Sequence, residues 1–260
     1  MRNFIKYFYR KVRMHSGLWP KYVTERIGDF IMSYIPSTDI GARLYRGWEF
    51  ENDEIAICCK YINKDSVVLD IGANIGLHAL SYSSIAKTVI AFEPQPETFK
   101  TLTRNIYQNN IKNIIPLNVA ITDTAEISTF NVVSDEAYSS LIDTGRKRFR
   151  EKINVLCETV DGLLGDMKID FIKIDVEGVE FKALQGMSKL IEKHKPIIFC
   201  EIYQGHIKSY DPNKTIDYMR NFGYIVYRFI GGGMVEMSVF TKHEDCYCNY
   251  LFIPVEGNNV

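Results

Sequence analysis

Apolar positions fall into two patterns along the middle of this 260-residue chain. Short apolar runs bounded by turn residues predict buried strands, as at 67–71 and 171–174. Between such runs apolar residues recur at helical spacing, as over 96–109. The other elements expected in this region are helices at 51–62, 75–86 and 179–191, and strands at 89–92, 114–119 and 197–201.

The alternation of strands and helices predicts a doubly wound, mostly parallel, Rossmann-like α/β sheet with helices on both faces. The pattern changes towards the C-terminus. After a helix at 215–222, strands expected at 224–230, 235–241 and 250–255 follow closely, with three glycines at 231–233. These last strands are predicted to pair antiparallel.

Two segments stand apart from this alternation. The run 126–133 alternates apolar and polar residues, which predicts a strand at the edge of the sheet. Residues 134–152 are polar and charged and contain the sequence RKRFREK. We expect them to form a mobile loop near a site.

The N-terminal segment is basic. Residues 1–26 hold seven Lys or Arg and one Glu, with apolar residues at helical spacing among them. Residues 27–48 resemble a second, partly apolar helix that ends at Pro36 and is followed by a loop. The sequence thus predicts a helical extension, 1–48, before a domain at 49–260. Its basic helix can contact a membrane surface or an acidic glycan, but packing against the domain or a second subunit of a homo-oligomer is favoured.

Composition limits the class of protein. With 46% hydrophobic residues and a net charge of −1, the chain can bury one domain's core and is not a globally basic nucleic-acid binder. No apolar run approaches the ~20 residues that span a bilayer, and the start lacks a signal-peptide cleavage site. The six cysteines include no C-x-x-C pair, which favours reduced thiols in a cytoplasmic protein, bound at most peripherally to the inner face of the membrane.

The stretch VVLDIGANIGLHAL at 67–80 organises the candidate chemistry. It reads as a buried strand, a tight bend and a helix, which is how α/β domains bind nucleoside-like ligands. The small residues Gly72, Ala73 and Gly76 are expected to let a ligand approach the backbone, and the helix N-terminus offers free N–H groups. The stretch therefore predicts a nucleotide-type pocket.

Acidic residues indicate which nucleotide. Asn74 replaces the second glycine of the dinucleotide motif, and Asp70 would repel a pyrophosphate. Asp70 suits the ammonium and sulfonium groups of S-adenosylmethionine instead. Glu93 ends the next strand, where a carboxylate can bind both ribose hydroxyls. Asp123 follows the third strand and is either an adenine contact or an ordinary turn residue.

Four segments in this order resemble the FkbM-type family of methyltransferases: LDIGANIGLHAL, AFEPQPETFKTLTRNI, IDFIKIDVEGVEFKALQGM and PIIFCEI. The resemblance covers about 47–202. It implies a doubly wound sheet, S-adenosylmethionine as the methyl donor, and O-methylation of hydroxyls on sugars or polyketide-type metabolites. By position it implies that the cofactor is held by Asp70, Gly72, Asn74, Gly76 and Glu93, and that Lys173, Asp175, Glu177 and Glu180 form the family's second motif.

Two further acids end strands at the same edge of the sheet. Asp175 follows 171–174, and Glu201 ends the next strand. They can supply the base that a hydroxyl acceptor needs, or they can bind Mg²⁺, with Glu177 as a third ligand. His206 is another candidate base, and Lys173 can pair with these acids. The structural alternatives are that Asp175 caps the following helix and that His206 is an exposed loop residue.

These observations favour a cytoplasmic O-methyltransferase that acts on a hydroxyl of a sugar, glycan or glycan precursor. Three alternatives stay open. The acceptor can be another small metabolite, or a nucleic acid bound through the basic segments. The fold can also bind the cofactor without catalysis and act as an assembly partner through 1–46.

Overall fold

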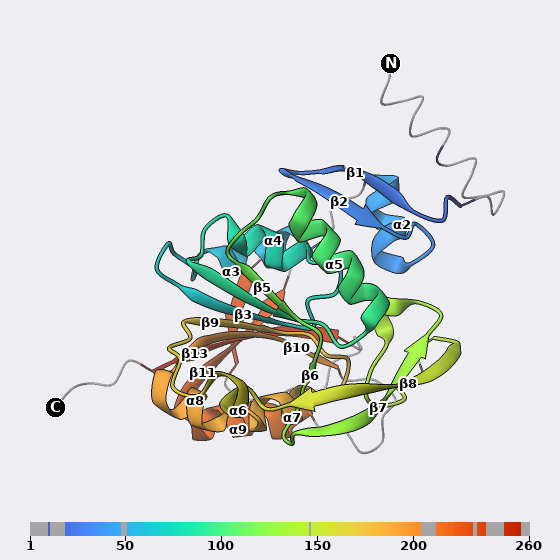
Figure 1. Ribbon diagram of the computed structural model, residues 1–260. Helices are drawn as coiled ribbons and strands as arrows, with labels where there is room; N and C mark the ends of the chain where they lie inside the picture. Colours follow the sequence, from blue (N-terminus) through green and yellow to red (C-terminus); the bar gives the residue numbers. More distant parts are fainter. Residues whose placement is uncertain are drawn as a thin grey trace.

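The centre of the molecule is an eight-stranded sheet with the strand order β12-β11-β13-β10-β9-β3-β4-β5 (Figure 1). The computed structural model describes Arg10 and residues 19–47, 51–145, 147–203, 212–230, 233–237 and 247–255. Strands β5, β4, β3, β9 and β10 are parallel, whereas β13 pairs antiparallel with both β10 and β11. Their bounds are β3 Val67–Ile71, β4 Thr88–Phe92, β5 Ile114–Leu117, β9 Phe171–Ile174, β10 Ile197–Tyr203, β11 Tyr224–Ile230, β12 Gly233–Glu236 and β13 Tyr247–Pro254.

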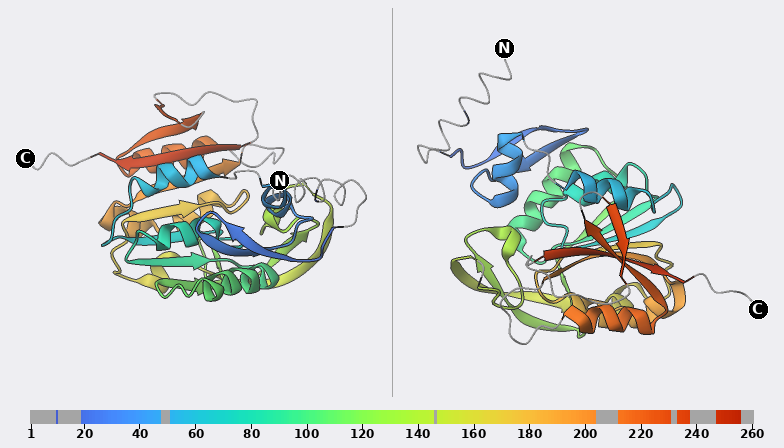
Figure 2. Two further views of the ribbon diagram at one scale, coloured as in Figure 1. Left: turned by 90° about the horizontal axis from the view of Figure 1, so that it is seen from above. Right: turned by 180° about the vertical axis from the view of Figure 1, so that it is seen from behind.

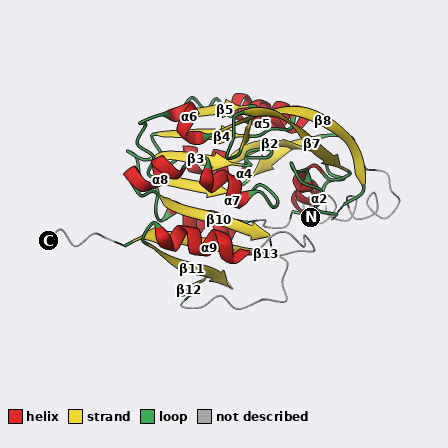
Figure 3. Ribbon diagram, turned by 90° about the horizontal axis from the view of Figure 1, so that it is seen from below, coloured by secondary structure: helices red, strands yellow, loops and turns green. Residues whose placement is uncertain are grey.

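Helices cover both faces of this sheet (Figures 1 and 3). One face packs on α3 (Asn52–Cys59), α4 (Leu77–Ser83) and α5 (Pro96–Gln108). The other packs on α6 (Val160–Leu164), α7 (Glu180–Gln185), α8 (Ser188–His194) and α9 (Pro212–Asn221). Each face has its own hydrophobic core because β3 and β9 are buried on both sides. The predicted doubly wound α/β fold with antiparallel pairing near the C-terminus is confirmed.

The order in which the chain adds strands to the sheet reverses at β3. From β3 it runs outward through β4 to β5, and it returns to the other side of β3 with β9 and β10. Ligands of doubly wound sheets bind outside the carboxyl ends of the strands at such a point. The fold therefore places its crevice between the ends of β3 and β9.

The N-terminal segment differs from the predicted helical extension. It contains a β-hairpin, β1 (Val23–Ile27) and β2 (Phe30–Tyr34), followed by helix α2 (Asp39–Arg46). A two-residue turn, in which Gly28 has a φ of 54°, connects the strands. The helical prediction was wrong over this hairpin, because its apolar residues flank a Gly-Asp turn. The loop predicted after Pro36 was wrong where α2 forms. The predicted basic helix lies mostly outside the described residues.

The hairpin lies beside α5 (Figure 2). A buried side-chain amide, that of Asn105, holds it there. The Ser33 backbone N–H donates to Asn105 Oδ1 at 2.7 Å, and Asn105 Nδ2 donates to the carbonyl oxygens of Ser33 at 3.1 Å and Ile75 at 2.7 Å. Asn105 thus joins the hairpin to the bend after β3. Met32 and Tyr34 complete the same hydrophobic core as Leu80 and Leu102.

A second sheet forms in the region after β5. Strands β6 (Ala120–Ile121), β8 (Phe149–Glu158) and β7 (Glu126–Val133) lie in that order. The run 126–133 is therefore a strand, as predicted, but it belongs to this separate sheet and not to the edge of the main one. The expected loop 134–152 is shorter, because residues 149–152 belong to β8 and a 3₁₀ turn occupies Glu136–Tyr138.

The helix predicted over 179–191 is interrupted at Gly186. A Cβ atom there would lie 1.9 Å from the carbonyl oxygen of Thr122, so only glycine permits this approach of the two segments. Among the described residues, no helix is both long and apolar enough to cross a membrane.

Candidate active site

The bend after β3 has an unusual backbone. Gly72 and Gly76 have φ values of 82° and 96°, and Asn74 has a φ of 50°. A Cβ atom on Gly72 would lie 1.8 Å from the carbonyl oxygen of Asp175, and one on Gly76 would lie 2.7 Å from Leu102 Cδ1. The two glycines therefore make room for other residues of the protein. The sequence analysis predicted that they make room for a ligand.

Glu93 is fixed at the end of β4 by backbone donors. The N–H groups of Asn74 and Gln95 donate to Glu93 Oε2 at 3.0 Å and to Oε1 at 2.9 Å. The Asn74 side chain turns back to accept from the N–H of Ile75 at 2.8 Å. Asn74 thus supports Glu93 from the left-handed conformation that asparagine tolerates.

A narrow cavity opens beside Glu93. Its walls are mainly apolar, and the carboxylates of Glu93, Asp175 and Glu177 border it. Apolar walls with a few polar groups suit the flat base and hydroxylated sugar of a nucleoside. Asp123 is exposed and is not among the lining residues, so its adenine contact stays a prediction. The lining includes Phe92, Pro94, Ile121, Phe130, Leu141 and Val176.

A larger cavity of about 380 Å³ adjoins the narrow one. Gly72, Asn74 and Asp175 belong to the walls of both. The structure brings the predicted Lys173, Asp175, Glu177 and Glu201 together in the larger cavity, whereas His206 lies outside the described residues. Six carboxylates line it, those of Asp39, Glu51, Glu54, Asp175, Glu177 and Glu201, together with Arg43, Lys173 and His78.

Lys173 is the buried cation of the site. Its Nζ lies 3.1 Å from Asp175 Oδ2 and 3.8 Å from Asp70 Oδ1. Burial alone would lower the pKa of Lys173, but the charges of Asp175 and Asp70 raise it above its ordinary value. Lys173 therefore stays protonated and fixes the Asp175 carboxylate.

Asp70 does not line the pocket in which the sequence analysis expected it. It is wholly buried, lines neither cavity, and its carboxylate oxygens have no hydrogen-bond partner among the described residues. Burial raises the pKa of Asp70, although Lys173 opposes the shift. Its visible role is to face Lys173, and the expected contact with the cofactor stays a prediction.

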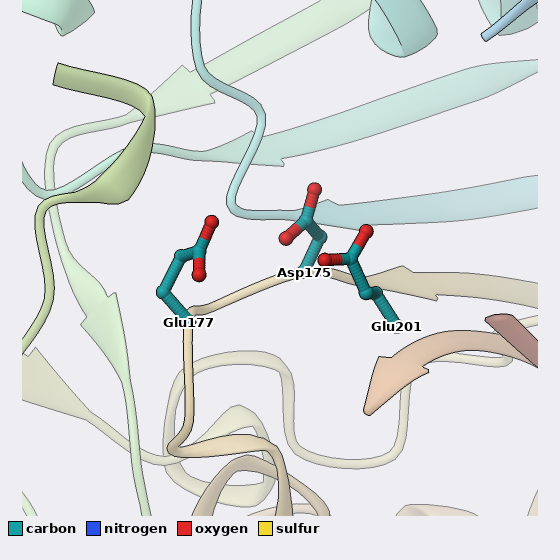
Figure 4. A group of neighbouring side chains, drawn as sticks. All are labelled: Asp175, Glu177 and Glu201. Atoms are coloured by element: carbon teal, nitrogen blue, oxygen red, sulfur yellow. The ribbon is translucent and has the colours of Figure 1, made fainter. Parts of the chain in front are cut away.

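Three acids meet at the ends of β9 and β10 (Figure 4). Asp175, Glu177 and Glu201 each offer an oxygen, and these atoms lie within 4.8 Å of one another. Glu177 has a φ of 54°, a strained conformation typical of functional turns. Burial and the charges of Asp175 and Glu177 raise the pKa of Glu201 well above its ordinary value. Among these three acids, Glu201 is thus the one whose carboxylate is made more basic by its surroundings.

These acids suit Mg²⁺ only in part. Carboxylate oxygens are the donors that this ion prefers. However, the Lys173 ammonium already lies 3.1 Å from Asp175 Oδ2, and it would repel a divalent cation bound to the same carboxylate. The three acids therefore fit the ion poorly.

His78 and Glu51 form a pair that the sequence analysis missed. His78 Nε2 lies 2.9 Å from Glu51 Oε2, and His78 Nδ1 lies 2.7 Å from the hydroxyl of buried Tyr82. Burial raises the pKa of Glu51, but the hydrogen bond and charge of His78 outweigh it, and the net pKa is lowered. The only local sequence signal was the spacing of His78 and Tyr82 on one helix face.

Helix α2 and the 3₁₀ turn form one wall of the larger cavity. The Asp39 N–H donates to Asp135 Oδ2 at 2.8 Å, and the Tyr138 hydroxyl donates to Asp39 Oδ2 at 3.0 Å. Arg43 Nη2 lies 3.2 Å from the same Asp39 oxygen. These contacts join the N-terminal segment to the loop after β7 in one wall of the cavity.

A doubly wound sheet with adjoining cavities at the carboxyl ends of β3, β4 and β9 defines a Rossmann-like class of protein. Within that class, the family model of the methyltransferase FkbM domain matches residues 70–226. The chain belongs to this family.

Two curated relatives match part of the chain. The hexuronic acid methyltransferase AglP of Haloferax volcanii is 30% identical over 160 residues, which is 60% of this chain and 63% of that protein. Methyltransferase 1 of Beauveria bassiana is 26% identical over 146 residues, 47% of this chain and 59% of that protein. The chain thus spans less than two thirds of the length of each.

A solved structure, methyltransferase FkbM from Methylobacillus flagellatus, is 17% identical to this chain. The match covers 73% of this chain and 44% of that one, with a TM-score of 0.47. At this level of similarity it adds nothing to the assignment of the site.

Proposed function

We propose that the protein is an S-adenosylmethionine-dependent O-methyltransferase that acts on a hydroxyl of a sugar or glycan precursor. The observation that carries the proposal is the junction of the narrow and larger cavities at Gly72 and Asp175. A nucleoside in the first would have its reactive end at the mouth of the second. Membership of the FkbM family supports methyl transfer, and the name of the Haloferax relative supports a sugar acceptor.

The narrow cavity fits the adenosyl part of the cofactor. Glu93 would accept hydrogen bonds from the ribose hydroxyls, because its oxygens are already oriented by Asn74 and Gln95. The apolar walls formed by Phe92 and Ile121 would contact the base. When bound, S-adenosylmethionine supplies an electrophilic methyl group on a positively charged sulfur, and Asp175 at the junction favours that charge.

The acids of the larger cavity would act on the acceptor. A neutral hydroxyl is a poor nucleophile, so a base must take its proton while the new C–O bond forms. Glu201 would hold that proton on a carboxylate oxygen, since its raised pKa matches the task. Asp175, fixed by Lys173, would orient the hydroxyl in line with the methyl group.

Calorimetry with S-adenosylmethionine, S-adenosylhomocysteine and NAD tests the cofactor. We expect binding of the first two and none of NAD, and the reverse pattern would overturn the proposal. Methyl-labelled S-adenosylmethionine and a panel of methyl glycosides then test transfer. Asp175→Asn should lose transfer but still bind S-adenosylhomocysteine, whereas the exposed Glu192→Gln should behave like the wild type.

A further inference from the structure

The wall of the larger cavity carries charges that lie outside the family match. Asp39, Arg43, Glu51 and Glu54 precede residue 70, where that match begins, yet all four line the cavity. They come from α2 and from the start of α3. Three of the four are acids, so this segment adds negative charge opposite Asp175 and Glu201.

We infer that the cavity takes a sugar acceptor without a negative charge, and that Glu51, held by His78, binds one of its hydroxyls. This inference rests on the proposed function and names the acceptor class of the same site. It departs from what the name of the Haloferax relative suggests, since a hexuronic acid carries a carboxylate.

The cations of the cavity are already engaged by acids. Lys173 contacts Asp175 and also faces Asp70, whose buried carboxylate has no hydrogen-bond partner among the described residues. Arg43 lies 3.2 Å from Asp39 within one turn of α2. A uronate would have to compete with these carboxylates for either cation and would meet Glu51, whose pKa is lowered by His78, as a like charge. An uncharged polyol meets neither obstacle.

Glu51 is the acid best prepared to bind such an acceptor. It has a φ of 57°, which orients the residue just before α3. One carboxylate oxygen, Oε2, contacts His78 Nε2 at 2.9 Å, and His78 is itself held by the Tyr82 hydroxyl at 2.7 Å. The carboxylate is therefore fixed and ionised while it borders the cavity. A fixed carboxylate accepts a hydrogen bond from a sugar hydroxyl with little loss of side-chain entropy.

Matched pairs of glycosides test the inference. Methyl β-D-glucoside and methyl β-D-galactoside are compared with the corresponding uronides, each with protein saturated by S-adenosylhomocysteine, using saturation-transfer NMR titrations. We expect at least one neutral glycoside to bind about tenfold more tightly than its uronide, which is roughly 1.4 kcal/mol. The ratio should shrink in high salt, because screening weakens repulsion of the uronide.

Variants separate recognition from folding. Glu51→Gln should weaken binding of the neutral glycoside and strengthen binding of the uronide, a change of selectivity that simple destabilisation would not produce. His78→Gln should weaken binding of the neutral glycoside as well, because Glu51 loses its support. Glu97→Gln, on the exposed surface of α5, is the matched control and should leave both affinities unchanged.

Three results would overturn the inference: a uronide that binds as tightly as its neutral partner, a Glu51→Gln variant with unchanged selectivity, or no binding of any glycoside. None of these results concerns cofactor binding. The calorimetric test can therefore support the proposed cofactor even if this inference about the acceptor fails.

Discussion

The two cavities are built from different parts of the chain. Every residue that lines the narrow cavity lies between Ile71 and Val179, inside the family match. The larger cavity takes Asp39, Arg43, Glu51 and Glu54 from the segment before that match. The narrow cavity is thus built entirely within the family match, whereas a segment before that match completes the walls of the larger cavity. In the proposed function the first would take the cofactor and the second the acceptor.

The sharpest test of the larger cavity is Glu201→Gln. We expect transfer to fall roughly 10²- to 10⁴-fold, because an amide cannot take the hydroxyl proton. Calorimetry should show unchanged affinity for S-adenosylhomocysteine, which would confine the effect to the acceptor side. A parallel loss of cofactor affinity would contradict the division between the two cavities.

Gly72→Ala should disturb the junction that both cavities share. Its Cβ atom would lie 1.8 Å from the Asp175 carbonyl oxygen, in addition to the cost of a φ of 82°. We expect a loss of at least ~3 kcal/mol in the free energy of unfolding, measured with urea.

Gly47→Ala is the matched control for this substitution. Gly47 also has a positive φ, 74°, in the left-handed helical region, but nothing lies within 4 Å of its Cβ position. Its loss should be about 1 kcal/mol, the cost of the backbone conformation alone. Equal losses would mean that the contact with Asp175 is unimportant.

Glu93→Gln should act on the narrow cavity alone. Weaker hydrogen bonds to the ribose should reduce affinity for S-adenosylhomocysteine about 10- to 100-fold, in line with the strength of charged hydrogen bonds. Binding of a neutral glycoside should not change. Thermal unfolding is the control here, because Glu93 also accepts from the backbone at Asn74 and Gln95.

The pH dependence of transfer reports on the acid cluster. A base works in its ionised form, so the rate should rise with pH through the raised pKa of Glu201 and then level off. Glu177→Gln removes one of the charges that raise this pKa, so the rise should move to lower pH. A rise centred at the ordinary glutamate pKa in the wild type would exclude Glu201 as the base.

The smallest expected effect is that of a chelator. Because Lys173 already occupies the cationic position beside Asp175, EDTA should leave transfer unchanged. Activity that is lost with EDTA and restored by Mg²⁺ would show that Asp175, Glu177 and Glu201 bind the ion after all.

Local patterns explain what the sequence predicted well. Strands β3, β9 and β11 were predicted with the bounds found in the structure, because each is an apolar run between turn residues. The positions of Glu93 and Glu201 at the same edge of the sheet could be predicted because parallel strands end at one edge. These inferences need only the neighbouring residues in the chain.

The misses depend on contacts between distant segments. Glu51 and His78 are 27 positions apart, and nothing near either residue indicates that they meet. The burial of Asp70 beside Lys173, 103 positions later, is not visible in its own strand either, while its contact with the cofactor stays a prediction. The close approach of Gly186, at the interruption of the predicted helix, to the Thr122 carbonyl oxygen is likewise a contact between distant segments.

The contacts of Asp39 with Asp135 and Tyr138 have a consequence for the timing of turnover. Two hydrogen bonds join α2 to the loop after β7. At a net value of roughly 0.5–1.5 kcal/mol each, separating both costs about 1–3 kcal/mol, so the separated form would make up about 0.5–15% of molecules at equilibrium. An acceptor that enters between these segments would find only that fraction of the protein ready, and its observed on-rate would be reduced in proportion.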